Sequence, residues 1–184
     1  MRSTTVISNG YTMQWKNTLI RFFEKKVKDD KQLLQYYNAK KLEIDDIGVH
    51  LAIFTEPFFS LLLAGKKTVE SRFSINKVTP FGKVGEGDIV FVKKSGGPVI
   101  GYFIVSETHY YGTVNSKQKK EIDRLYSKEI CTTAVDDFWS SRSEAKYVSL
   151  FELQNLKRIT PFSIDKKDRT AWAVIKPSGV AALF

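Results

Sequence analysis

The spacing of apolar residues divides the chain into a helical beginning and a strand-rich remainder. Over residues 12–28, apolar side chains recur at helical spacing, and Lys and Arg fill the opposite face. Thr12 is a candidate N-cap for this helix. Asp29 or Asp30 is a candidate cap for a second, shorter helix. The pattern predicts a basic, amphipathic helical extension over residues 1–45, whose apolar stripe we expect to pack on the domain that follows.

Residues 46–184 contain short strand-like segments separated by bends that are marked by glycine. Val49–Phe54 and Ile89–Val92 have the composition of buried strands, and Lys146–Leu153 alternates between apolar and polar residues. Lys93–Pro98 contains two adjacent glycines and is typical of a hairpin turn. Helices are inserted between the strands without regular alternation. This order favours an α+β fold, a small and mostly antiparallel β-barrel with inserted helices, over a doubly wound sheet.

Two of these inserted helices are expected in the second half of the chain. Asn115–Ser127 is highly charged and carries a few apolar residues at helical spacing. Thr133–Ser140 follows, and we expect its side chains Phe138 and Trp139 to face inward.

The stretch Gly65–Arg72 concentrates charge where a helix gives way to a strand. Gly65 indicates the end of a short apolar helix, because glycine adopts the left-handed backbone without steric cost. Strand alternation then places Glu70 and Arg72 on one face, with the apolar side chains of Val69 and Phe73 on the other. Lys67 joins this pair only if the corner turns it inward. The arrangement can receive a polar ligand, and a solvated edge-strand ion pair is the alternative.

Composition limits the classes of partner. The chain has 29 Lys and Arg residues against 20 Asp and Glu residues, a formal net charge of +9. Such a surface attracts polyanions, of which nucleic acid is the commonest, although many basic proteins bind none. The charge therefore favours a nucleic acid or nucleotide partner over a neutral one.

Cysteine and histidine are scarce. Cys131 is the single cysteine, which excludes an intrachain disulfide, and we expect it to be a small buried residue. With only His50 and His109 besides, no zinc constellation is apparent, so no metal and no cofactor are predicted. His50 is interpreted as a flank residue of its strand. No apolar run is long enough to span a membrane, and no signal peptide is evident, so a cytoplasmic protein is expected.

The spacing Gly65-x-Lys67-x-x-Glu70-x-Arg72 resembles the GxKxxExR signature of the ASCH domain family, a branch of the PUA-like β-barrels. The similarity continues on both sides of the motif. Gly85–Val90 resembles that family's Gly-Asp strand start, and Lys166–Trp172 resembles the ending of several members. Membership implies a barrel with a cleft beside the motif.

PUA-like relatives use such clefts for RNA or a modified base, so the resemblance implies an RNA, nucleoside or nucleotide partner. Arg72 offers a planar donor fork for phosphate or a base edge, and Glu70 can accept from an exocyclic amine or hold Arg72. Lys67 can pair with phosphate. Lys93 and Lys94 beside the hairpin turn suit a phosphate backbone, with a solvated hairpin shoulder as the alternative.

Aromatic side chains supply candidate stacking surfaces for bases. Tyr110, Tyr111 and Trp172 are the candidates, since base–aromatic stacking contributes about 1–3 kcal/mol per base. For Trp172, which lies in an apolar strand, core packing is the favoured interpretation.

A hydrolase is the alternative to a binding domain. Some small ASCH proteins remove the acyl group of N4-acetylcytidine, and at least one has been described as a ribonuclease. Lys67 would then be the base and Glu70 its acid–base partner. In the amidohydrolases, however, the position of Glu70 carries a threonine nucleophile, which a carboxylate replaces poorly. A third alternative is an interaction domain whose basic N-terminal helices dock a partner.

Overall fold

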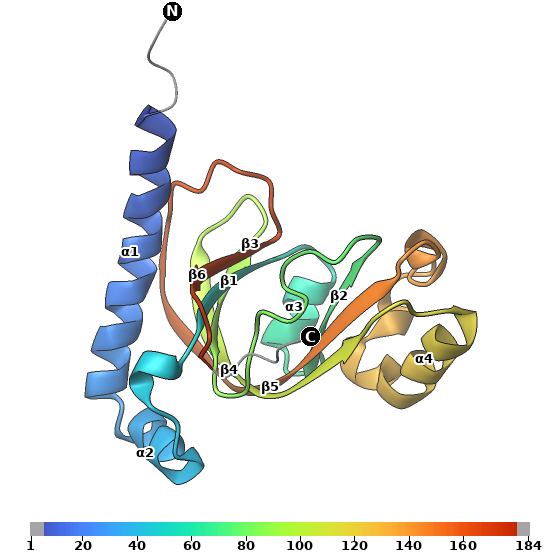
Figure 1. The fold of residues 1–184 in the computed structure, drawn as a ribbon, viewed down its shortest axis with the longest axis horizontal. Helices are drawn as coiled ribbons and strands as arrows, with labels where there is room; N and C mark the ends of the chain where they lie inside the picture. Colours follow the sequence, from blue (N-terminus) through green and yellow to red (C-terminus); the bar gives the residue numbers. More distant parts are fainter. Residues whose placement is uncertain (1–5, 180–184) are drawn as a thin grey trace, which may run out of the picture.

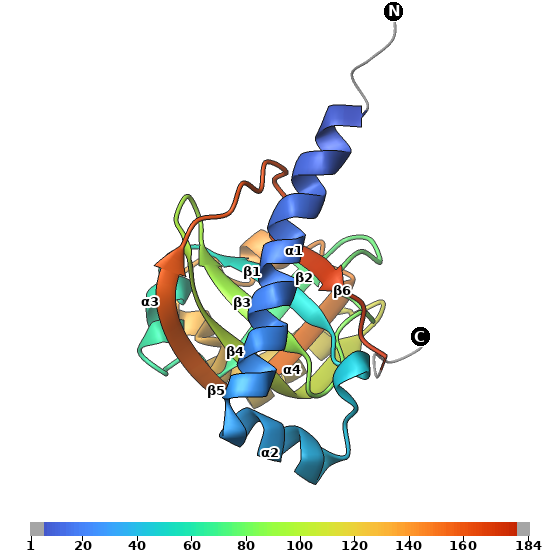
Figure 2. The same cartoon turned by 90° about the vertical axis from the view of Figure 1, so that its left-hand side faces the viewer.

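A curved six-stranded sheet forms the centre of the molecule (Figures 1 and 2). The computed structural model describes residues 6–179. The strands are β1 (Val49–Phe54), β2 (Val69–Ser74), β3 (Ile89–Lys94), β4 (Val99–Tyr111), β5 (Tyr147–Phe162) and β6 (Trp172–Lys176), in the order β2-β5-β4-β3-β1-β6. Among these strands β1 and β3 pair in parallel, and the other neighbours pair antiparallel. The predicted class, a mostly antiparallel PUA-like barrel of α+β type, is confirmed.

Helices lie at both ends of this sheet. The α-helices are α1 (Val6–Asp29), α2 (Lys31–Lys40), α3 (Phe58–Leu63) and α4 (Ser116–Ile130), and short 3-10 helices span Ile44–Asp46, Thr132–Ala134 and Ser140–Arg142. α1 runs along one side of the molecule and α4 lies at the opposite end (Figure 1). None of the helices in the described part of the chain is both long and apolar enough to cross a bilayer.

The start of α1 differs from the sequence prediction, whereas the start of α2 agrees with it. α1 begins at Val6, so Thr12 lies inside the helix and does not cap it. Asp30 caps α2, where its Oδ1 accepts from the backbone N–H groups of Gln32 and Leu33 at 3.1 Å each. The same carboxylate is ion-paired with Lys157 of β5, which fastens the junction of the two helices to the sheet.

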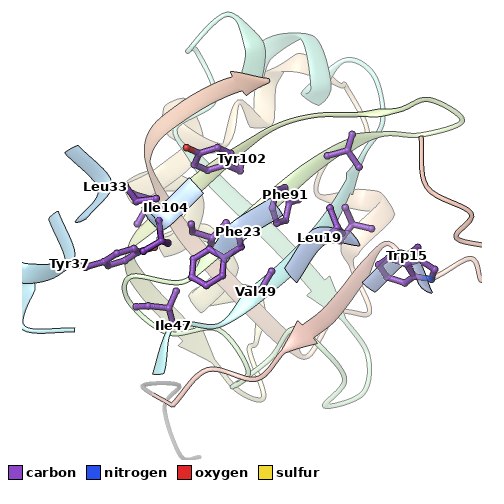
Figure 3. Close-up of a cluster of buried hydrophobic side chains, with 14 residues drawn as sticks. Trp15, Leu19, Phe23, Leu33, Tyr37, Ile47, Val49, Phe91, Tyr102 and Ile104 are labelled. Atoms are coloured by element: carbon purple, nitrogen blue, oxygen red, sulfur yellow. The ribbon is translucent and has the colours of Figure 1, made fainter. Parts of the chain in front are cut away.

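The apolar faces of α1 and α2 are buried against the sheet (Figure 3). Helix residues in this cluster include Trp15, Leu19, Phe23, Leu33 and Tyr37, and they pack with strand residues that include Val49, Phe91, Tyr102 and Ile104. This is the packing expected for the amphipathic stripe. The helices and the sheet thus share one hydrophobic core, and the boundary between residues 1–45 and 46–184 remains a prediction.

The predicted helix Thr133–Ser140 is absent. Its place is taken by two 3-10 helices and a turn, although Phe138 is buried as expected. Cys131 is also not a buried core residue. It is half-buried and adopts a left-handed backbone (φ 65°) as the C-cap of α4. The β-branched residues that follow it favour extended or short turn structure over a continued α-helix.

Candidate functional site

The corner between α3 and β2 turns Lys67 into the protein. Gly65 has φ +68°, the left-handed conformation predicted for it, and the backbone N–H groups of Lys66 and Lys67 both donate to the carbonyl of Leu61. This tight exit from α3 directs the Lys67 side chain inward. The residue retains only 3 % of its exposure.

Lys67, Glu70 and Arg72 meet in one buried charge cluster. Nζ of Lys67 lies 3.3 Å from Oε2 of Glu70 and donates to the carbonyls of Val69 (2.7 Å) and Ile130 (3.3 Å). Oε1 of Glu70 lies 2.7 Å from Nε of Arg72, an ion pair in which the N–H bond is not aligned with the oxygen. Glu70 thus lies between two cations. The alternative considered from the sequence, a solvated ion pair on an edge strand, does not describe this cluster, because Lys67 and Glu70 are buried.

Burial sets the acid–base properties of Lys67. Removal from water lowers the pKa of the Lys67 ammonium, and the positive charge of Arg72 lowers it further, whereas Glu70 opposes the shift. The ring of Phe58, with Nζ 5.3 Å from its centre, closes one side of the ammonium. Perturbed lysines of this kind occur at functional sites and also within structural ion-pair networks.

The guanidinium group of Arg72 is held in one orientation by its neighbours. Its Nη2 donates to the carbonyl of Ile53 at 3.1 Å. The guanidinium carbon lies 5.3 Å from the ring centre of Trp172 and 5.6 Å from that of Phe54. These cation–π contacts and the ion pair to Glu70 fix the orientation of a side chain that is still 19 % exposed.

Two hollows adjoin Arg72 on either side. The smaller has a volume of about 130 Å³, and its lining includes Thr55, Phe58, Lys67, Glu70, Phe138 and Arg142. The larger has a volume of about 420 Å³, and its lining includes Phe73, Pro80, Ser149, Thr170 and Trp172. Arg72 lines both. We call the two hollows together the Arg72 groove.

Arg142 is a site residue that the sequence did not reveal. It lies in the 3-10 helix Ser140–Arg142, stacks over Phe138 at 4.1 Å and donates from Nη1 to the Phe138 carbonyl at 2.7 Å. Burial lowers the pKa of this guanidinium from its very high ordinary value, and it remains a cation at neutral pH. The only signal in the sequence is one arginine beside an aromatic pair, and nothing in that pattern ties it to a motif 70 residues away.

The two tyrosines predicted to stack on bases do not line the Arg72 groove. The hydroxyl of Tyr110 donates to the carbonyl of Val84 (2.7 Å) and accepts from its N–H (3.0 Å), while its ring packs on Phe81 and Phe151. Tyr111 belongs to the cluster under α4, on the other face of β4. Trp172 is 5 % exposed, in agreement with the core packing favoured for it, and borders the larger hollow.

The hairpin lysines also stay outside the groove. Nζ of Lys93 donates to the carbonyl of Gly97 at 2.6 Å, so this side chain closes its own turn. Lys94 forms an exposed ion pair with Glu56 at 3.3 Å. Neither residue lines the hollows beside Arg72.

A second buried charge cluster lies beneath Trp172. His50, interpreted from sequence as a flank residue, is fully buried in β1, and its Nε2 lies 2.9 Å from Oδ2 of Asp88. The Asp88 carboxylate also accepts from the backbone N–H groups of Gly48 (2.6 Å) and Gly85 (2.7 Å). The indole N–H of Trp172 points at Nδ1 of His50 from 3.5 Å, which requires the proton of a neutral imidazole to be on Nε2.

The fold and the GxKxxExR cluster together define a PUA-like barrel of the ASCH type. The ASCH domain model matches residues 51–163, more than half of the chain, and the protein therefore belongs to the ASCH domain family.

Solved structures agree at the level of the fold. The ASCH protein from Zymomonas mobilis superposes with a TM-score of 0.54 and 12 % identity over 68 % of this chain and 86 % of that one. A Ser-to-Ala mutant of that protein superposes with a TM-score of 0.55 and 15 % identity, over 70 % of this chain and 89 % of the mutant's chain. A comparison with curated proteins finds no match.

Proposed function

We propose that the protein binds RNA or a modified nucleotide in the Arg72 groove. The observation that carries this proposal is the position of Arg72, a guanidinium fixed by Glu70 and Trp172 between a polar hollow and an aromatic one. A nucleotide has the matching division into an anionic phosphate and an aromatic base.

The smaller hollow suits the phosphate. Arg72 and Arg142 both line it, and Lys67 with Glu70 forms its inner wall. Guanidinium groups bind phosphate oxygens through paired N–H donors, and the formal net charge of +9 favours the approach of a polyanion. In this arrangement Lys67 and Glu70 act mainly as buried supports that hold Arg72 in position.

The larger hollow suits the base. Its volume of about 420 Å³ lies within the range of about 300–1,000 Å³ that is usual for small-molecule sites. Phe73, Pro80 and Trp172 provide apolar walls, while Ser149 and Thr170 bring hydroxyl groups that can read a base edge. A modified base is accommodated by such a pocket when its substituent is small and polar.

The test is a binding series on the full chain. Fluorescence anisotropy with labelled single-stranded and double-stranded RNA, and calorimetry with cytidine monophosphate, would be performed across a salt series. Arg72→Ala should weaken binding at least about tenfold, or about 1.4 kcal/mol, and reduce the salt slope by about one phosphate contact. The matched control is Arg124→Ala on α4, because Arg124 is exposed and pairs only with Glu121 among the described residues. Equal binding by wild type and Arg72→Ala would refute the groove assignment.

A hydrolase is the second candidate function, and the lowered pKa of Lys67 beside a hollow favours it. Against it stand the three acceptors around Nζ, which hold the ammonium in place, and Glu70 at the position of the amidohydrolase threonine. Wild type and Lys67→Met would be incubated with N4-acetylcytidine and with single-stranded RNA, and the products separated by chromatography. Turnover by wild type that disappears in Lys67→Met would support the hydrolase, whereas no turnover of either substrate would remove it.

A further inference from the structure

Three side chains with metal-binding atoms converge on the face of the sheet opposite Glu70. Glu107 and His109 are two residues apart on β4 and therefore share a face, and Glu152 on β5 is paired directly with Glu107. Glu152 is also paired with Val69 of β2, whose side chain points away from the Arg72 groove. This group, which we call the β4–β5 cluster, therefore lies on the face of the sheet opposite Glu70 and Arg72.

The separations within the β4–β5 cluster match those of ligands around a common ion. One ligand atom from each residue lies within 4.8 Å of the others. Nε2 of His109 is 3.5 Å from Oε1 of Glu152 and 3.7 Å from Oε1 of Glu107. These distances are longer than a strong hydrogen bond of about 2.7–3.2 Å. They resemble the separation of about 3.3–3.6 Å between ligands placed tetrahedrally at bond lengths of about 2.0–2.2 Å from a metal.

Charge makes the same arrangement unfavourable without a cation. Two carboxylates directly opposite one another on neighbouring strands repel. In the described part of the chain, His109 lies within 4 Å of both Glu107 and Glu152, and even a protonated imidazole can neutralise only one of the two carboxylates. A divalent cation neutralises both carboxylates and binds the imidazole in its neutral form.

The backbone and one neighbour hold the three groups in place. All three residues lie on paired strands, and ligand groups on strands are held more rigidly than groups on loops. The His109 ring lies 5.5 Å from the Tyr126 ring of α4, which restricts its rotation. The side chains of Glu107, His109 and Glu152 are 61 %, 22 % and 38 % exposed, so an ion can enter from solvent and keep water as a further ligand.

We propose that Glu107, His109 and Glu152 form a binding site for a divalent first-row transition ion such as Zn²⁺. One imidazole with two carboxylates suits this class of ion better than Ca²⁺ or Mg²⁺, which prefer ligand sets made of oxygen. The bound ion joins β4 to β5 and stabilises the folded state in proportion to its occupancy. From the sequence no metal site was predicted, because only sets of cysteine and histidine residues were considered. The proposed site combines one histidine with a carboxylate from its own strand and a carboxylate from the neighbouring strand.

The experiment uses the full chain after treatment with a chelator and dialysis. Co²⁺ would be titrated with detection of its visible absorption, and Zn²⁺ by calorimetry, and each should bind with a 1:1 stoichiometry at the site. His109→Ala and Glu107→Gln should each weaken binding at least about tenfold. Zn²⁺ should raise the unfolding temperature of wild type but not that of His109→Ala. Glu121→Gln is the control, an exposed carboxylate on α4 paired with Arg124 outside the β4–β5 cluster.

Two results would overturn the proposal. One is the absence of Co²⁺ and Zn²⁺ binding by wild type. The other is binding that His109→Ala and Glu107→Gln leave as tight as in wild type, which would locate the ion elsewhere. Circular dichroism of each variant establishes that it is folded. Glu107 is the most exposed of the three, so its substitution tests the site even where His109→Ala disturbs packing against Tyr126.

Discussion

Two buried carboxylates, Asp88 and Glu70, have similar burial and different partners. Asp88 is fully buried and accepts from two backbone N–H groups and from His50. Glu70 is 4 % exposed and is neutralised by two side-chain cations, Lys67 and Arg72, which border a hollow. A carboxylate bound by backbone amides organises the chain around it, whereas one bound by side-chain cations orients groups that can also face a ligand.

The difference has an energetic counterpart. Removing one partner from a buried, hydrogen-bonded charge leaves the others unsatisfied and is strongly destabilising. The backbone N–H groups of Gly48 and Gly85 donate to Asp88 and lose this acceptor when Asp88 is replaced. Lys67, in contrast, still donates to two backbone carbonyls when Glu70 is replaced. We therefore expect substitutions in the Asp88 cluster to lower the stability of the fold most, and substitutions in the Glu70 cluster to affect ligand binding most.

The largest effect is expected for Asp88→Ala. It leaves two backbone N–H groups and His50 without their acceptor inside the core, which should lower the free energy of unfolding by about 3–5 kcal/mol. Urea denaturation followed by circular dichroism measures this change. Glu121→Ala, an exposed site, should change it by no more than about 0.5 kcal/mol. If Asp88→Ala lowers the free energy of unfolding by less than about 1 kcal/mol, the hydrogen bonds of Asp88 do not stabilise this part of the fold as proposed.

A smaller loss of stability is expected for Glu70→Gln. Lys67 and Arg72 then lack a counter-charge, and the free energy of unfolding should fall by about 2–3 kcal/mol. The double variant Lys67→Met/Glu70→Gln should recover part of the loss, because it removes the buried ammonium together with its partner. A denaturation series on Glu70→Gln, Lys67→Met and the double variant checks this. If the loss of stability in the double variant equals or exceeds the sum of the two single losses, the two residues are not coupled as a charge pair.

Arg72→Ala should affect stability least and binding most. The side chain is partly exposed and Glu70 keeps Lys67, so the cost in unfolding free energy should be about 1 kcal/mol. The same variant should lose the affinity for RNA or nucleotide described above. Arg72→Lys retains the charge but loses the planar contact with Trp172, and we expect it to recover affinity only in part. A large loss of stability in Arg72→Ala would make this residue a structural one, like Asp88.

The subtlest effect is a pH dependence due to Lys67. Its pKa in the folded protein lies below the ordinary value of 10.5, so between these two pKa values the unfolded chain binds more protons than the folded one. The free energy of unfolding should therefore rise with pH across that window as the penalty for burying an ammonium disappears. Lys67→Met lacks this group, and denaturation curves of both proteins over neutral to alkaline pH measure the difference. Parallel pH profiles would show that the pKa of Lys67 is not lowered.

Local patterns predicted the part of the site that depends on neighbours in sequence. Glu70 and Arg72 share a face because a strand alternates with a period of two, and the exit from α3 depends on Gly65. Contacts between distant segments were beyond such reasoning. Arg142 reaches the Arg72 groove from a segment that is distant in sequence, and His50 meets Asp88 only because β1 and β3 pair in parallel.

The tyrosines and the lost helix show a second limit. Tyr110 does lie on the same face of the sheet as Phe151, but the backbone of Val84 captures its hydroxyl, which a strand pattern cannot reveal. Thr133–Ser140 has apolar residues at helical spacing, yet the left-handed cap at Cys131 and the residues after it lead to short turns. In both cases hydrogen bonding and backbone conformation, which periodicity does not reveal, decided the local structure.

The core beneath α1 and α2 also constrains the order in which the protein can be completed. Its members come from the first helices and from the final strands, since Ile159 of β5 and Ala173 and Ile175 of β6 pack against it. During synthesis the two helices leave the ribosome long before those strands exist, and their apolar faces have no native surface to cover. The nascent chain therefore carries a basic amphipathic segment whose apolar face is open to chaperones until β6 emerges, and β6 closes the core that α1 begins.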